Sequence, residues 1–115
     1  MPQLVPCPNL IGGEWTTVSG VAVSPVHNPS VGVVIAETPL CGADVVDQAV
    51  EAAARAFPGW METPPVERAR VLFRLKVMLE GEFDALARSV TLEHGKTLVE
   101  ARGDVRRGLE NIEFA

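Results

Sequence analysis

An arginine in the last segment of the chain has the chemistry to bind a ligand. Drawn as a helix at about 100° per residue, the segment places Gly103, Arg107 and Phe114 within an arc of about 40°. Arginine can bind a carboxylate through two parallel hydrogen bonds, and a glycine inside a helix often reflects close approach by another element. The pattern indicates a helix between two layers, with Arg107 directed at a partner. From the pattern alone, a surface ion pair with Asp104 or Glu110 is the simpler explanation of this arginine, because surface arginines are common, and both explanations stay open.

A glycine and lysine motif before this segment lacks what nucleotide binding requires. Gly95-Lys96-Thr97 is similar to the end of a phosphate-binding loop, but the glycine needed five positions before the Gly-Lys pair is replaced by Val90. We therefore expect a turn between helices with a solvated lysine. The dinucleotide-binding pattern GxGxxG is missing from the 115 residues. No cofactor-binding residue is predicted in this chain.

The histidines and cysteines are too isolated to form a catalytic or metal site. His27 and His94 lie on different expected elements with too few ligands nearby, so no metal site is predicted. Cys7 and Cys41 lack CxxC spacing and are expected to be free thiols. Cys41 lies at the start of an expected helix, where its spacing to Asp44 is that of a capping box. No histidine lies near Cys41 in the sequence to act as a base, and no catalytic residue is predicted.

The first 40 residues predict an N-terminal β-hairpin region. Residues 1–9 contain three prolines and little pattern, which predicts a loose N-terminal arm. Residues 11–15 are expected to form a short strand with a glycine turn. Residues 21–26 and 33–38 are rich in β-branched side chains, and Asn-Pro and Gly between them mark a turn. These two runs are expected to pair as a hairpin.

Three amphipathic helices are predicted after the hairpin. The first covers about 43–57 and should end at Pro58-Gly59. The second begins at Thr63-Pro64-Pro65, with Thr63 as its cap, and continues to residue 90, with room for a bend at Gly81. The third begins at Leu98. The apolar stripes expected to face a core are Val45, Ala49, Ala52, Ala53 and Ala56, then Leu72, Leu75, Leu79, Phe83, Leu86 and Val90, then Leu98, Ala101, Val105, Leu109 and Ile112.

Composition narrows the class of protein. The chain is 47% hydrophobic and 22% charged, which is typical of a globular protein. Its net charge of −5 argues against a nucleic acid or an anionic membrane as partner. No apolar run approaches the roughly 18 residues of a membrane span, and the first residues lack the basic start of a signal peptide.

The pattern of elements predicts that something is missing. The last helix ends in Glu113-Phe114-Ala115, without the glycine, asparagine or basic residues that usually end a helix. A two-stranded hairpin is marginal by itself, and three amphipathic helices need a wider sheet to cover. We therefore expect an incomplete piece of a larger protein.

Five stretches of the chain together resemble one enzyme family. They are LIGGEW (10–15), HNPSVGVVIAETP (27–39), DQAVEAAARAFPGW (47–60), ERARVLFRLKVMLE (67–80) and TLEHGKTLVEARGDVRRGLENIEFA (91–115). Their order resembles the N-terminal region of aldehyde dehydrogenases, and the last stretch is most similar to the methylmalonate-semialdehyde, CoA-acylating branch. The resemblance implies the α/β fold of that family. It also implies that residues 10–115 are an incomplete N-terminal portion of the NAD-binding domain, without the core of the nucleotide fold.

The resemblance also implies a function for the complete enzyme. That enzyme would be a cytoplasmic, NAD-dependent homo-oligomer, in which a cysteine thiolate attacks the semialdehyde and coenzyme A takes the resulting thioester. In this branch the arginine matching Arg107 holds the carboxylate of the substrate, whereas Arg106 has no such role. Neither Cys7 nor Cys41 matches the nucleophile, so the chain is not expected to be catalytic alone.

Other interpretations of the chain remain open at this point. A non-catalytic truncated module could dock onto a full-length homologue or a second chain that carries the remaining domains. A relic without function would instead expose its apolar helix faces and be poorly soluble. The residues do not choose between these interpretations, nor between malonate and methylmalonate semialdehyde.

Overall fold

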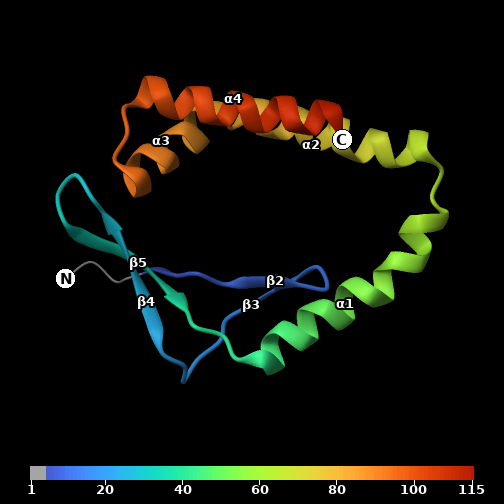
Figure 1. Ribbon diagram of the computed structural model, residues 1–115, viewed down its shortest axis with the longest axis horizontal. Helices are drawn as coiled ribbons and strands as arrows, with labels where there is room; N and C mark the ends of the chain where they lie inside the picture. The colour runs from blue at the N-terminus through green and yellow to red at the C-terminus, as the bar shows by residue number, and fades with distance from the viewer. Residues whose placement is uncertain (1–4) are drawn as a thin grey trace. The chain divides into compact units, whose positions relative to one another are not determined.

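The computed structural model describes residues 5–115, with side chains from Cys7 onward. Two compact units are present, and each is described by itself (Figure 1). The first contains residues up to His27 together with Gly32–Glu62, and the second contains Asn28–Val31 together with Thr63–Ala115. No helix among the described residues is long and apolar enough to cross a membrane.

The first unit contains a three-stranded sheet in the order β1 (Val5–Pro6), β5 (Val33–Pro39) and β4 (Val23–Asn28). The connection between β4 and β5 is only four residues long, which requires antiparallel pairing and confirms the predicted hairpin. β1 pairs in parallel with β5, and the backbone N–H of Cys7 donates to the carbonyl of Glu37 at 3.0 Å. The prediction of a loose arm over residues 1–9 therefore does not hold for β1, while residues 1–4 lie outside the described residues.

A second small sheet is the antiparallel hairpin of β2 (Asn9–Ile11) and β3 (Glu14–Thr16). Gly12 and Gly13 join the strands with φ angles of +62° and +86°, the left-handed conformations that a tight two-residue turn requires. The sequence predicts only one strand here. The pairing partner was missed because each strand is three residues long, too short to show an alternating pattern.

Helix α1 (Ala43–Glu62) turns its small side chains toward this hairpin. A shallow groove is lined by Gly12 and Gly13 and by the predicted alanine face of α1. The helix does not end at Pro58, as predicted, but continues through it for four residues. A proline removes one helical hydrogen bond, and here the following residues keep the helical path despite that loss.

The second unit contains helices α2 (Pro65–Gly81), α3 (Phe83–His94) and α4 (Leu98–Phe114). α4 packs against both α2 and α3 (Figure 1). Residues 5–115 thus form four helices instead of the predicted three, because the long second helix breaks at Glu82, directly after Gly81. α2 begins with Pro65 at its first position, and Pro64 rather than Thr63 is its N-cap residue.

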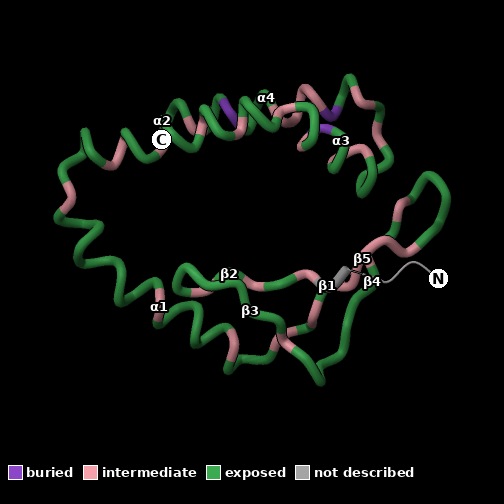
Figure 2. Tube along the Cα trace, turned by 180° about the vertical axis from the view of Figure 1, so that it is seen from behind, coloured by how far each residue is buried: buried purple, intermediate pink, exposed green. Residues whose placement is uncertain are grey.

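The core of the second unit lies along α4, where this helix packs against α3 and α2. The buried positions among the described residues all belong to α3 and α4 (Figure 2). They are Ala87 on α3 and Ala101 and Leu109 on α4. Ala101 and Leu109 belong to the predicted apolar stripe of the last helix, which is therefore confirmed as its packing face. Small alanine side chains at the contact allow the two helices to approach closely.

Large apolar side chains remain exposed on both units. Trp15 in β3 is 70% exposed, and Phe114 at the end of α4 is 91% exposed. Other exposed residues include Val46, Val50 and Phe57 on α1 and Phe73, Val77 and Met78 on α2. This is more exposed apolar surface than a monomeric soluble protein usually shows.

Candidate functional site

The start of helix α4 is fixed by a capping box. The Thr97 hydroxyl accepts a hydrogen bond from the backbone N–H of Glu100 at 3.3 Å, and the Glu100 carboxylate accepts from the backbone N–H of Thr97 at 3.1 Å. The Thr97 hydroxyl also donates to this carboxylate at 2.8 Å. The hydrogen bond from the Thr97 hydroxyl has the largest effect on the pKa of Glu100, followed by the bond from the Thr97 backbone N–H. Both lower this pKa because they stabilise the charged form of the carboxylate. The cap sets where the residues of α4 point.

Three charged residues, one in the turn before α4 and two on the helix itself, form a continuous chain of ion pairs. The Lys96 ammonium contacts Oδ2 of Asp104, and Nη2 of Arg107 contacts Oδ1 of the same carboxylate. The hydrogen bond from Lys96 has the largest effect and lowers the pKa of Asp104. The positive charge of Arg107 lowers it further. Lys96 is only 23% exposed, so the expectation of a solvated lysine is wrong. We call these residues the Lys96–Asp104–Arg107 cluster.

Arg107 lies at the exposed end of this cluster. Its side chain is 71% exposed, and it makes the surface ion pair with Asp104 that the sequence offered as the alternative to ligand binding. A guanidinium has five N–H donors, and one nitrogen contacts Asp104. The remaining donors have the number and geometry needed to bind a second carboxylate. The ion pair and the binding role are therefore compatible.

The face of α4 that carries Arg107 has no second layer among the described residues. A Cβ built on Gly103 would meet no heavy atom within 4 Å, and Phe114 is almost fully exposed. The close approach that the sequence predicts at this glycine is therefore not supplied by residues 5–115. It stays a prediction about elements beyond them.

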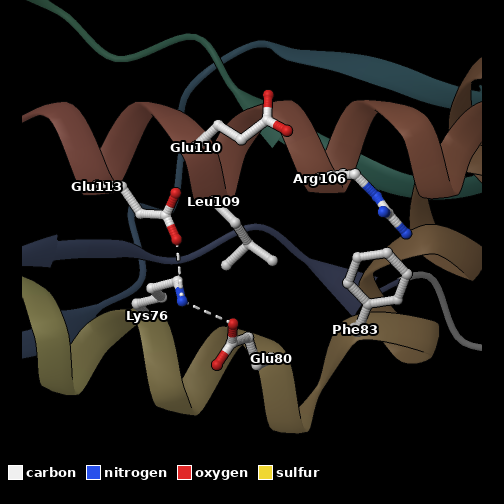
Figure 3. Close-up of a pocket in the computed structure, with 7 residues that line it drawn as sticks. All are labelled: Lys76, Glu80, Phe83, Arg106, Leu109, Glu110 and Glu113. Atoms are coloured by element: carbon white, nitrogen blue, oxygen red, sulfur yellow. Dashed lines mark ion pairs between the residues drawn. The ribbon is translucent and has the colours of Figure 1, made fainter.

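Arg106 points into a different region, a hollow between α2 and α4 shown in Figure 3. There Lys76 of α2 pairs with Glu80 at 2.9 Å and with Glu113 of α4 at 3.0 Å. The Lys76 ammonium donates hydrogen bonds to Glu80 and, with a smaller effect, to Glu113, and these bonds raise the pKa of Lys76. The hollow contains three carboxylates against two cations and is a poor site for an anion. The residues that line it are Lys76, Glu80, Phe83, Arg106, Leu109, Glu110 and Glu113.

The two thiols hydrogen-bond to uncharged groups, and the two histidines lie on different elements, His27 in β4 and His94 at the end of α3. Cys7 accepts from the Thr38 hydroxyl at 3.9 Å, and Cys41 accepts from the Asn9 amide at 3.4 Å. Cys41 also donates to the Pro39 carbonyl and does not cap α1, because Gly42 accepts the first helical bond. Residues 5–115 contain no group of three or more His, Cys, Asp or Glu side chains that could hold a metal.

A strand followed by a helix occurs where β5 leads into α1, as in nucleotide-binding folds. The turn between them, residues 40–42, contains one glycine and not the GxGxxG pattern. A Cβ on Gly42 would lie 2.8 Å from the Asp44 carboxylate, whose charge disfavours a phosphate at this helix start. This turn does not fit a dinucleotide.

Comparison with known proteins links the whole arrangement to one family. A profile of the aldehyde dehydrogenase family matches residues 15–115. Malonate-semialdehyde dehydrogenase from Bacillus pumilus is 45% identical over 107 residues, which are 93% of this chain and 22% of that protein. The protein of the same name from Pseudomonas aeruginosa is 42% identical over 107 residues, again 93% of this chain and 21% of that protein. The chain thus spans less than a quarter of the length of these relatives.

Solved structures show the same fold. Methylmalonate-semialdehyde dehydrogenase from Oceanimonas doudoroffii matches with a TM-score of 0.92 and 39% identity, over 96% of this chain and 22% of that one. A candidate methylmalonate-semialdehyde dehydrogenase from Sinorhizobium meliloti, solved with NAD, matches with a TM-score of 0.93 and 34% identity. This match covers 99% of this chain and 23% of that one. Lactaldehyde dehydrogenase from Escherichia coli matches with a TM-score of 0.92 and 28% identity, over 97% of this chain and 24% of that one. These three structures thus match the backbone of this chain about equally well, while sequence identity is higher to the first two than to the lactaldehyde enzyme.

Proposed function

The chain belongs to the aldehyde dehydrogenase family, and from this premise we propose that it is the N-terminal part of an enzyme that oxidises malonate or methylmalonate semialdehyde. The predicted resemblance and fold class are thus confirmed, and the family is one of oxidoreductases. The observation that carries the proposal is the 45% identity to a malonate-semialdehyde dehydrogenase along 93% of the chain. The residues of α4 add a chemical reason, because both substrates carry a carboxylate.

In the proposed enzyme, Arg107 binds the carboxylate of the semialdehyde. The exposed guanidinium provides bidentate hydrogen bonds to a planar anion, which fixes the orientation of the substrate as well as its affinity. An aldehyde without a carboxylate cannot make this contact. In this proposal, Arg107 therefore contributes to substrate selection. The residues that react with the substrate lie on other parts of the enzyme.

We propose that NAD and coenzyme A also bind outside residues 5–115. NAD would accept a hydride from the substrate, and coenzyme A would take the acyl group from a cysteine thioester. In support of this, the turn after β5 does not fit a dinucleotide, and the hydrogen-bond partners of Cys7 and Cys41 are Thr38, Asn9 and Pro39, which are not bases. This chain would supply outer strands and helices that support the cofactor-binding domain, of which residues 10–115 are a portion.

The remainder of a dehydrogenase chain is the proposed partner of the exposed apolar surfaces. Val46 and Phe57 on α1 and Phe114 on α4 are among the side chains that such a partner would cover. We also propose a homo-oligomer in the cytoplasm, in keeping with the two free cysteines.

A hybrid enzyme tests the proposed function. This chain replaces the matching N-terminal segment of the Bacillus pumilus enzyme, and NADH formation is measured with malonate semialdehyde and coenzyme A. We expect activity from the hybrid and none from the 115-residue chain alone. Arg107→Ala should reduce kcat/KM for malonate semialdehyde by about 10- to 100-fold, the usual effect of losing hydrogen bonds between charged groups.

The control substrate is propionaldehyde, which is neutral and of similar size. Its kcat/KM should change by no more than about twofold in Arg107→Ala, because no charged hydrogen bond is lost. Arg106→Ala is the matched control variant, and it should leave the preference for the acidic substrate unchanged. An equal loss for both substrates in Arg107→Ala would refute carboxylate binding by this residue.

A non-catalytic docking module is the second candidate function. The observation that favours it is the large apolar surface exposed on both units. It predicts that the purified chain forms a stable complex with an intact relative, detected by light scattering as an increase in mass equal to one chain. Failure to bind any intact relative, together with an active hybrid, would exclude this candidate.

A further inference from the structure

Asp104 is the central member of the Lys96–Asp104–Arg107 cluster. Each of its two carboxylate oxygens has a cation of its own, Lys96 on Oδ2 and Arg107 on Oδ1. Lys96 and Asp104 are mostly covered, at 23% and 28% exposure, whereas Arg107 extends into solvent. The cluster thus has an inner charged pair and an exposed arginine.

The charge balance of this cluster determines what Arg107 can attract. An isolated pair of Asp104 and Arg107 would be neutral and would attract a carboxylate weakly. Lys96 adds a second positive charge, so that the three groups together carry a net charge of +1. Because Lys96 and Asp104 are partly shielded from water, their charges are screened less than those of exposed groups.

One further carboxylate, Glu100, lies close enough to influence both Lys96 and Asp104. It is engaged by the backbone N–H and hydroxyl of Thr97 in the capping box. It also lies in the first turn of α4, where the positive end of the helix dipole offsets a negative charge. Glu100 therefore does not cancel the positive charge at the Arg107 end of the cluster.

The backbone on both sides of Lys96 is held in place. Gly95 ends α3 with a φ of +80°, and a Cβ at this position would lie 2.8 Å from Cγ of Pro29. Thr97 is locked by the capping box of α4. Lys96 thus reaches Asp104 from a fixed point, which reduces the entropy lost in keeping the contact.

We propose that Lys96 and Asp104 are positioning residues that set the preference of Arg107 for acidic substrates. Asp104 holds the guanidinium on the exposed face of α4, and Lys96 offsets the negative charge of Asp104, so that Arg107 still attracts a carboxylate. This inference rests on the proposed function of Arg107. It extends that function to a lysine in the turn before α4 and to an aspartate on the helix.

The test compares KM for malonate semialdehyde with KM for propionaldehyde in the hybrid enzyme. Lys96→Met should raise KM for the acidic substrate on the order of 3-fold, the size expected for losing one partly screened charge several ångströms away. KM for the neutral substrate should stay unchanged. Adding Asp104→Asn to Lys96→Met removes the negative charge as well and should bring KM for the acidic substrate back toward its original value.

Two further variants serve as controls. Arg102→Met also removes one positive charge and breaks an ion pair between α4 and α3, with Asp84 at 2.9 Å, but it does not touch the cluster. It should leave the substrate preference unchanged. Lys96→Arg keeps the charge and should behave like the original enzyme, and it provides the comparison if Lys96→Met folds poorly.

The results separate this inference from the proposed function. If Arg107→Ala abolishes the acidic preference and Lys96→Met affects both substrates equally or neither, the inference is wrong and the proposed function stands. If the double variant fails to recover while folding normally by circular dichroism, the charge-balance role is also wrong. If Arg107→Ala affects both substrates equally, the proposed function fails and the inference fails with it.

Discussion

A guanidinium can serve two carboxylates at once, and this is the chemistry that Arg107 offers. The Asp104 carboxylate contacts one terminal nitrogen of Arg107, and the side chain is otherwise largely exposed. Asp104 in turn is shared with Lys96, so that it does not neutralise the arginine alone. At the scale of the residue, the ion pair with Asp104 is therefore compatible with the proposed carboxylate-binding role of Arg107.

The lowered pKa of Asp104 predicts how stability depends on pH. A carboxylate whose pKa is lower in the folded than in the unfolded state contributes stability above its unfolded pKa, and this contribution is lost as pH falls through the folded pKa. The free energy of unfolding should therefore decrease as pH falls below about 4, the usual range for aspartate. Urea unfolding of the hybrid enzyme between pH 7 and pH 3 measures this effect.

Asp104→Asn should reduce this dependence on acid, because the variant has no proton to gain at this position. Lys96→Met should reduce it as well, since Lys96 is the main cause of the lowered pKa. If the stability curves of both variants fall as steeply with acid as that of the original enzyme, Asp104 does not contribute to the acid response.

At the scale of the element, α4 organises the second unit. Its apolar stripe packs on α2 and α3, and its charged residues connect to both of them through Lys76–Glu113 and Arg102–Asp84. Exposed ion pairs of this kind contribute little free energy each. The apolar stripe and the capping box therefore decide where α4 lies, and the ion pairs fix the positions of individual side chains.

Thr97→Ala tests the importance of the helix start. Loss of the capping box should lower the free energy of unfolding by about 1 kcal/mol, because the first N–H groups of α4 lose their partner. It should also speed amide hydrogen exchange in the first turn of α4. Thr97→Ser keeps the hydroxyl and should stay close to the original protein, and equal exchange rates in the alanine variant would contradict a stabilising cap.

At the scale of the whole molecule, neither unit covers its own apolar surface. Few side chains are buried among the described residues, and both tryptophans, Trp15 and Trp60, are exposed. Relatives are more than four times as long, since this chain spans 22% of the Bacillus pumilus enzyme. A surface of this kind is stable in water when other elements pack on it.

Gly103→Ala tests whether another element packs on the outer face of α4. In the 115-residue chain the change should raise the free energy of unfolding by about 0.5–1 kcal/mol, because alanine favours a helix and nothing lies within 4 Å of the new Cβ. In the hybrid enzyme it should lower the melting temperature, since the added methyl group would meet the packed element. Gly108→Ala is the control on the same helix.

For this prediction to hold, Gly103→Ala must raise the stability of the 115-residue chain and lower that of the hybrid enzyme. Thermal unfolding by circular dichroism gives the melting temperature in each. A rise in both the short chain and the hybrid enzyme would mean that no element approaches Gly103 closely, and the two-layer interpretation of α4 would be abandoned.

The sequence by itself determined the features that depend on local periodicity and composition. The hairpin of β4 and β5, the start of α4 and its apolar stripe follow from spacings of a few residues, and the structure confirms each of them. The family could also be recognised, because many short matches in the right order are together specific. The role of Arg107 was predicted from this resemblance and from its helix face, and it remains a prediction.

Only the tertiary structure decided the features that join residues far apart or balance competing local preferences. The parallel pairing of β1 with β5 connects residues about 30 positions apart. Lys96, in the turn before α4, forms an ion pair with Asp104 on the helix. The continuation of α1 through Pro58 went against a local rule, whereas the bend that the sequence allowed at Gly81 became a complete break between two helices in the structure. Helix propensity and spacing act over a few residues, whereas these contacts depend on where the chain has already folded in space.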